Sequence, residues 1–150
     1  MRSLLALSLL TAAVSGCSTH QCDASSSDAG GGQVTEYAGT WTWQTSSLQS
    51  GWIPFNGNET IRFTLPSGFP STSTPGFTLS AYVSTSDAGQ TPEARGQFVQ
   101  AAGQLAEFAN VTEHSFTVLN DTCSDYYLRV VATVTVPTAP VDAGPDASHD

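Results

Sequence analysis

Alternation of apolar and polar residues with a period of two is the feature that most constrains the fold of this chain. It runs through 37–44, 60–65, 77–83 and 116–118, and a longer Thr- and Val-rich segment follows at 126–136. Because successive side chains of a β-strand point to opposite faces, this alternation is typical of half-buried strands. The sequence therefore predicts an all-β domain in which 126–136 is a central strand.

Turn-forming residues separate these segments at short intervals. The breaks at 66–70 and 71–76 are rich in Pro, Gly, Ser and Thr, which favour turns. Strands at this spacing predict a single antiparallel β-sandwich of about seven strands, with a small closed barrel as the alternative. Gly39-Thr40-Trp41 resembles the Gly-X-Trp motif on the first strand of lipocalins. That resemblance implies a barrel that carries a small apolar ligand.

The segment 92–110 permits two interpretations. A Thr-Pro pair at its start could begin a helix, because Thr is a good cap and Pro is tolerated in the first turn. Two internal glycines would cost such a helix about 1 kcal/mol each relative to alanine. We favour a hairpin with strands at 96–100 and 104–111, and the helix remains the alternative.

The chain begins with a segment typical of a secretory signal. Arg2 precedes a Leu- and Ala-rich run over 3–13, which is shorter than the ~20 apolar residues that span a bilayer. The next four residues, Val-Ser-Gly-Cys ending at Cys17, resemble the lipobox of bacterial lipoproteins. The resemblance implies that 1–16 is a cleaved signal peptide and that Cys17 is lipidated.

A lipidated Cys17 would hold the protein at a bacterial membrane. Each buried CH₂ contributes ~0.8 kcal/mol, so two or more acyl chains bind almost permanently. Ser18 follows Cys17, whereas in lipoproteins of this kind an Asp at that position favours retention in the inner membrane. The resemblance therefore implies a cell-envelope location, with the outer membrane preferred over the inner. An ordinary cleaved signal with an unmodified Cys17 is the alternative.

The chain has three cysteines, so one disulfide leaves one cysteine over. If Cys17 is lipidated, Cys22 and Cys123 remain as a pair in an oxidising compartment. Their disulfide would close a loop of about 100 residues, for which chain-entropy estimates give up to ~4.7 kcal/mol. We expect this internal disulfide, with free thiols or pairing to another molecule as the alternative.

Low-complexity segments flank a single domain. The segment 17–33 is rich in Ser, Gly and Asp, which predicts a flexible tether. The segment 137–150 is acidic and rich in Pro, Ala and Gly, which predicts a disordered tail. Its Asp-Ala-Gly-Pro-Asp-Ala string resembles the linkers of myxobacterial lipoproteins. The all-β domain is therefore expected at 34–136.

The charge of the chain excludes several partners. Four Arg, no Lys and thirteen acidic residues give a formal net charge of −9. Nucleic acids and anionic lipid surfaces both require a cationic surface, which this chain lacks. We therefore expect no nucleic-acid partner, and no membrane contact except through the lipid anchor.

The sequence offers little for catalysis. His20 and His149 lie in the expected tails, so His114, beside Glu113, is the only histidine of the domain. A catalytic site needs a nucleophile with a base, paired carboxylates or a metal cluster. We therefore predict that the protein is not an enzyme and has neither cofactor nor metal site. An acid–base pair formed by Glu113 and His114 is the enzymatic alternative.

The three tryptophans are the candidate ligand-binding residues. Trp41 and Trp43 share one face of the strand predicted at 37–44. We expect this face in the core, because a Trp side chain buries 150–250 Å². If it were exposed, it would form a platform for stacking sugar rings, as in carbohydrate-binding sandwiches. Trp52 lies in the turn-rich segment 50–57, either exposed or folded over one end of the core.

Together these features predict a lipid-anchored, non-catalytic domain of the bacterial envelope. Its expected role is binding or scaffolding, with a glycan or an envelope protein as partner. A lipocalin-like carrier of a small apolar ligand and a carbohydrate-binding module are the alternative roles. No feature of 34–136 identifies a family for the domain itself.

Overall fold

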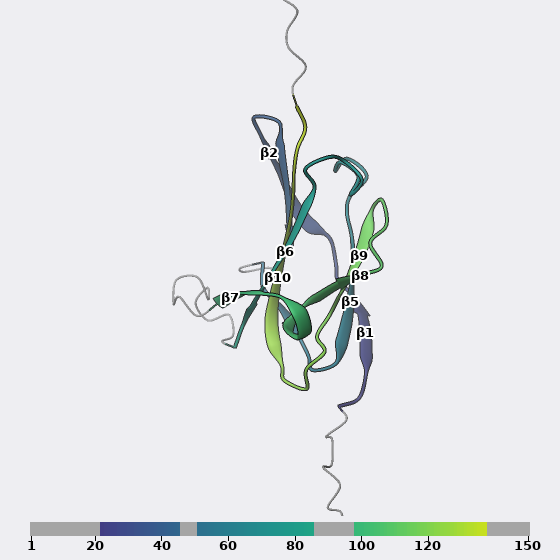
Figure 1. Ribbon diagram of the computed structural model, residues 1–150, viewed down its shortest axis with the longest axis vertical. Helices are drawn as coiled ribbons and strands as arrows, with labels where there is room; N and C mark the ends of the chain where they lie inside the picture. Colours follow the sequence, from purple (N-terminus) through teal and green to yellow (C-terminus); the bar gives the residue numbers. More distant parts are fainter. Residues whose placement is uncertain (1–21, 46–50, 86–97, 138–150) are drawn as a thin grey trace, which may run out of the picture.

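The computed structural model describes residues 22–45, 51–85 and 98–137, which form two β-sheets packed together (Figure 1). The four-stranded sheet has the order β1-β5-β9-β8, with β1 at Ser25–Asp28, β5 at Glu59–Thr64, β8 at Glu107–Ala109 and β9 at Ser115–Leu119. The six-stranded sheet has the order β2-β3-β10-β6-β7, with β2 at Gly32–Tyr37, β3 at Thr40–Thr45, β6 at Thr78–Ser84, β7 at Phe98–Ala101 and β10 at Tyr126–Thr135; β4 (Ile53–Phe55) also pairs with β10. The predicted all-β sandwich is confirmed.

Strand β10 organises the six-stranded sheet, as the Thr- and Val-rich segment predicts. One of its edges pairs with β4 over 126–128 and with β3 over 131–135. Its other edge pairs with β6 over 127–133. Branched side chains suit such a strand, because they pack well on a pleated surface with neighbours on both sides.

Aromatic rings fill the centre of the sandwich. Phe63 of β5 and Phe116 of β9 stack with their ring centroids 5.3 Å apart. The indole of Trp43, on the opposite sheet, meets each of them edge-on at 5.9 Å. Such edge-to-face pairs add to the stability that area burial alone provides. The other large, fully buried hydrophobic side chains are Phe55, Leu65, Val118, Leu128, Val130 and Val134.

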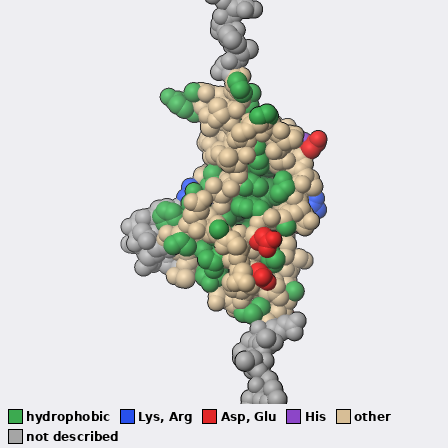
Figure 2. Space-filling view, viewed as in Figure 1, with side chains coloured by type: hydrophobic (Ala, Val, Ile, Leu, Met, Phe, Trp, Pro, Cys, Tyr) green, Lys and Arg blue, Asp and Glu red, His purple; other side chains and the backbone are tan. Residues whose placement is uncertain are grey.

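Neither sheet closes on itself in the described part of the chain, so the barrel alternative is wrong. Strands β2 and β7 bound the path of the six-stranded sheet, and β1 and β8 bound the other sheet. Figure 2 shows hydrophobic side chains reaching the surface between the two sheets, over the middle of the face seen in Figure 1. A lipocalin-like carrier needs a closed barrel around its ligand, so that alternative has no structural basis.

The prediction of a single strand over 37–44 is wrong, because the chain reverses within it. Strand β2 ends at Tyr37 and pairs with Thr40 of β3 across a two-residue turn. In this turn Ala38 has a φ of 50° and Gly39 a φ of 78°. Positive φ at both positions matches the right-handed twist of the two strands. This hairpin is one reason why the described residues form ten strands and not about seven.

The hairpin expected within 92–110 is wrong in its pairing. Both strands exist, but β7 pairs with β6 in one sheet and β8 pairs with β9 in the other. A 3-10 turn at Gly103–Leu105 carries the chain between the sheets, beginning with Gly103 at a φ of 61°. This crossing buries Ala101 and Ala106 in the core, which a surface hairpin would not do. The helix alternative is absent from 98–110, and 92–97 lie outside the described residues.

The flexible tether expected at 17–33 is wrong for its second half. Strand β1 lies parallel to β5, and β2 begins at Gly32. The amide of Ser25 donates to the carbonyl of Asn58 at 3.1 Å, and that of Ala29 to the carbonyl of Arg62 at 2.9 Å. These backbone bonds do not depend on side chains, so the Ser-rich composition is compatible with a strand. The ordered domain therefore begins before residue 34, and β1 is the parallel exception in an antiparallel sandwich.

Several predictions concern residues outside the described part of the chain. These are the signal peptide at 1–16, the lipidation site Cys17 and the disordered tail from 138 onward. Among the described residues, no helix has the length and apolar character needed to cross a bilayer.

Candidate functional site

The first two candidate tryptophans lie on the inner face of the six-stranded sheet. Trp43 is fully buried, and Trp41 is half-buried with its ring edge-on to Phe69 at 6.5 Å. The expectation that both belong to the core is confirmed. The exposed sugar-stacking platform formed by these two residues is therefore wrong, because alternation directs both side chains toward the opposite sheet.

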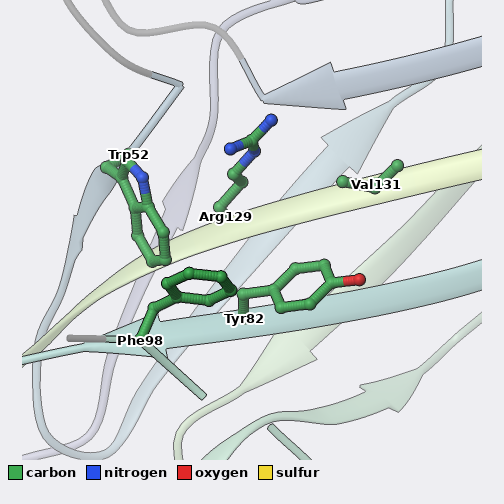
Figure 3. Close-up of a pocket in the computed structure, with 5 residues that line it drawn as sticks. All are labelled: Trp52, Tyr82, Phe98, Arg129 and Val131. Atoms are coloured by element: carbon green, nitrogen blue, oxygen red, sulfur yellow. The ribbon is translucent and has the colours of Figure 1, made fainter. Parts of the chain in front are cut away.

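The third candidate, Trp52, lines a hollow on the outer face of the six-stranded sheet. This hollow has a volume of about 260 Å³ and is lined by Trp52, Tyr82, Phe98, Arg129 and Val131. We call it the Trp52 hollow. Trp52 precedes β4, and the other four residues come from β6, β7 and β10 (Figure 3). The loop residue therefore folds onto the sheet, and only 3% of its surface stays exposed.

The aromatic rings of the hollow form a connected series. Phe98 lies between the other two, with its ring centroid 6.1 Å from that of Trp52 and 5.9 Å from that of Tyr82. Both pairs are edge-to-face, at 62° and 67°. Phe98 keeps 37% of its surface exposed, and Tyr82 is partly exposed. The hollow therefore presents aromatic surface to solvent beside a buried indole.

A polar pair borders the aromatic series. In Figure 3 the guanidinium of Arg129 lies near the nitrogen-bearing end of the Trp52 indole, and Phe98 lies near its other end. Its Nη2 donates to Oε1 of Gln44 at 2.9 Å. Apolar walls with a few fixed polar groups are typical of small-ligand sites.

Sequence reasoning missed Tyr82, Phe98 and Arg129 as site residues. The alternation of β6 and β10 indicates that Tyr82 and Arg129 point away from the core. Their proximity depends on the register that sets Arg129 opposite Tyr82. Phe98 joins them because β7 adds to the edge of β6. Nothing in the local pattern of 98–101 specifies that partner.

The predicted disulfide is present between Cys22 and Cys123, whose Cα atoms are 5.5 Å apart. Asn120 orders the loop that carries Cys123. Its Nδ2 donates to the carbonyls of Asn56 and Ser124, both at 2.9 Å, and its Oδ1 accepts from the Thr122 amide at 3.0 Å. The side chain of Asn120 is fully buried and supplies the hydrogen-bond partners that backbone groups of this loop would otherwise lack. Its role is therefore structural.

A buried carboxylate supports the same end of the sandwich. Glu59 accepts hydrogen bonds at 2.7 Å from the Asn56 amide and from Oγ of Ser27. Nδ2 of Asn56 donates to the same carboxylate at 3.0 Å. Charge-assisted bonds of this kind compensate for the burial of a carboxylate. Glu59 therefore connects β1 to the turn before β5.

Glu113 and His114, the residues of the enzymatic alternative, do not form an assembled catalytic site. Glu113 and His114 are both exposed, in the connection that precedes β9. Their backbone carbonyls accept from the amides of Thr72 and Leu65, at 3.1 and 2.8 Å. Among the described residues no group of three His, Cys, Asp or Glu side chains could hold a metal ion.

No protein-family model, curated protein or solved structure matches the chain.

Proposed function

We propose that the protein is a non-catalytic glycan-binding module, anchored at Cys17 to the bacterial cell envelope, with its ligand held in the Trp52 hollow. The observation that carries the proposal is the aromatic series of Trp52, Phe98 and Tyr82 beside the polar pair of Arg129 and Gln44. A sugar ring is amphipathic in the same way, since it has apolar C–H faces and polar hydroxyl edges. Aromatic rings accept the faces, and fixed polar groups orient the edges.

The fold supports a binding role, because two of the residues that line the hollow lie on paired inner strands of the sheet. Tyr82 and Arg129 belong to β6 and β10, which pair over seven residue positions. Protein side chains that strands already hold in place lose little freedom when a ligand binds. Less affinity is therefore lost to ordering them. The lipobox-like sequence ending at Cys17 supports display of this module on a membrane.

Alanine substitution in the hollow tests the proposal. We expect Phe98→Ala and Tyr82→Ala to weaken glycan binding by about tenfold or more, because each removes an aromatic wall. Isothermal titration calorimetry against a panel of purified glycans measures the loss. Both residues are partly exposed, so the variants retain the core.

Tyr37→Ala is the matched control. Tyr37 is 85% exposed next to the turn between β2 and β3, and does not line the hollow. Its loss should leave the affinity unchanged. The proposal fails if no glycan binds, or if Tyr37→Ala weakens binding as much as Phe98→Ala does. Binding of an envelope protein that survives both hollow variants would point to a protein partner instead.

A further inference from the structure

A row of threonines crosses the outer face of the six-stranded sheet next to the Trp52 hollow. Pairing sets Thr35 opposite Thr42, Thr42 opposite Thr133, and Thr133 opposite Thr78. The row therefore crosses β2, β3, β10 and β6. Trp43, the chain neighbour of Thr42, is buried against the other sheet, so alternation directs the row away from the core.

The hydroxyl groups on this face are held by one another. Oγ1 of Thr40 lies 3.2 Å from Oγ1 of Thr135, a pair two residues further along each strand than Thr42 and Thr133. The hydroxyls of Thr78 and Thr133 are also hydrogen-bonded. A hydroxyl has one donor and two acceptor lone pairs, so each bonded pair still offers a donor and acceptors to a ligand. The face therefore presents uncharged polar groups at fixed positions.

This hydroxyl surface is continuous with the hollow along β10. Arg129 and Val131 line the hollow, and Thr133 and Thr135 follow on the same face at two-residue spacing. The six steps from Arg129 to Thr135 cover about 20 Å. Within the described strands of this sheet, Arg129 is the only charged side chain that alternation directs to the outer face.

We propose that this surface binds a linear, uncharged polysaccharide, with one sugar in the hollow and the following sugars along β10 over the threonines. The inference rests on the proposed function and adds the class of ligand to it. A polyhydroxyl chain matches a row of hydroxyls with an aromatic hollow at one end. A polyanionic glycan would be repelled by a protein of net charge −9. One sugar occupies only the hollow, so affinity must increase with chain length.

Calorimetry on the mature protein with cello- and chito-oligosaccharides, from disaccharide to hexasaccharide, tests this inference. We expect at least about a tenfold gain in affinity across a series. The Thr42→Val/Thr133→Val variant removes two hydroxyls while keeping branched side chains that suit strands. It should weaken hexasaccharide binding by about tenfold and disaccharide binding by less than about twofold. Thr64→Val, exposed on β5 of the other sheet, is the matched control and should bind as the wild type does.

The outcomes separate this inference from the proposed function. Equal affinity for disaccharide and hexasaccharide, or an unaffected double variant, overturns the extended site and leaves binding in the hollow intact. Preference for oligogalacturonides over both uncharged series overturns the uncharged class of ligand alone. Absence of binding to every oligosaccharide overturns both.

Discussion

At Gly32 the backbone of β2 passes so close to the indole of Trp43 that no side chain fits between them. A Cβ built on Gly32 would lie 2.2 Å from Cε2 and 2.3 Å from Nε1 of Trp43. The indole cannot retreat, because Phe63 and Phe116 pack against it. Protein interiors are close-packed, so such a contact forces a shift of the backbone or of the ring.

We therefore expect Gly32→Ala to lower the free energy of unfolding by about 1–3 kcal/mol, the usual cost of overpacking. Urea denaturation followed by tryptophan fluorescence measures the change. Gly30→Ala is the matched control, since a Cβ at Gly30 meets nothing within 4 Å. Equal stability of the two variants would show that β2 does not press on Trp43.

The residues of the core could be predicted from the sequence, whereas of the residues that line the hollow the sequence indicates only Trp52. Trp43 belongs to the core because its own strand alternates, which is a local signal. Trp52 reaches the hollow from a loop, and Phe98 reaches it from an edge strand. Their meeting depends on pairing between segments far apart in the chain, which periodicity does not encode.

At the scale of elements, the turn between β2 and β3 carries a backbone conformation that disfavours its residue. Ala38 has a φ of 50°. At this φ a residue with a Cβ is sterically strained, whereas glycine is not. We expect Ala38→Gly to raise the free energy of unfolding by up to about 1 kcal/mol, less the chain entropy that glycine adds to the unfolded state. Thermal denaturation measures the difference.

Ala102→Gly provides the opposite case. Ala102 has a φ of −150°, which any residue adopts, so glycine there should only destabilise, by about 0.5–1 kcal/mol. If both substitutions destabilise the protein equally, Ala38 does not adopt the left-handed conformation. The turn has Ala38-Gly39 where such turns favour Asn-Gly, so the sequence by itself does not indicate a hairpin here.

We expect strand β1 to depend on the disulfide between Cys22 and Cys123. Its four residues are all exposed, so burial contributes little to holding it on β5. We expect the Cys22→Ala/Cys123→Ala variant to lose about 2–4 kcal/mol of stability, since the bond closes a loop with a sequence separation of 101. Hydrogen exchange should become fast at 25–29 and stay slow in β10. Unchanged protection of β1 would show that its backbone bonds hold it without the disulfide.

At the scale of the whole molecule, the sandwich has two distinct ends. Strand β1 and the first described residues lie at one end of the long axis, and the β2–β3 hairpin extends toward the other (Figure 1). The five residue-to-residue steps from Cys17 to Cys22 span at most about 18 Å. A lipid at Cys17 would therefore keep the disulfide end near the membrane and direct the hairpin away from it.

Metabolic labelling with a clickable palmitate tests the anchor in native cells. We expect Cys17→Ser to lose the label and the lipid mass at its amino terminus, because the acylated sulfur is gone. The Cys22→Ala/Cys123→Ala variant is the control and should keep both. A wild-type protein recovered without lipid, or a label that persists on Cys17→Ser, contradicts the anchor.

Glycan binding in the Trp52 hollow is tested by a titration followed by the indole N–H signals of the three tryptophans in a ¹⁵N correlation spectrum. Trp52 lines the hollow, whereas Trp43 is sealed in the core and Trp41 packs on Phe69. An added cello- or chito-hexasaccharide should shift the Trp52 signal in a saturable way and leave the Trp43 signal in place. A Trp52 signal that never moves, or shifts at Trp41 and Trp43 in its place, would contradict glycan binding in the hollow.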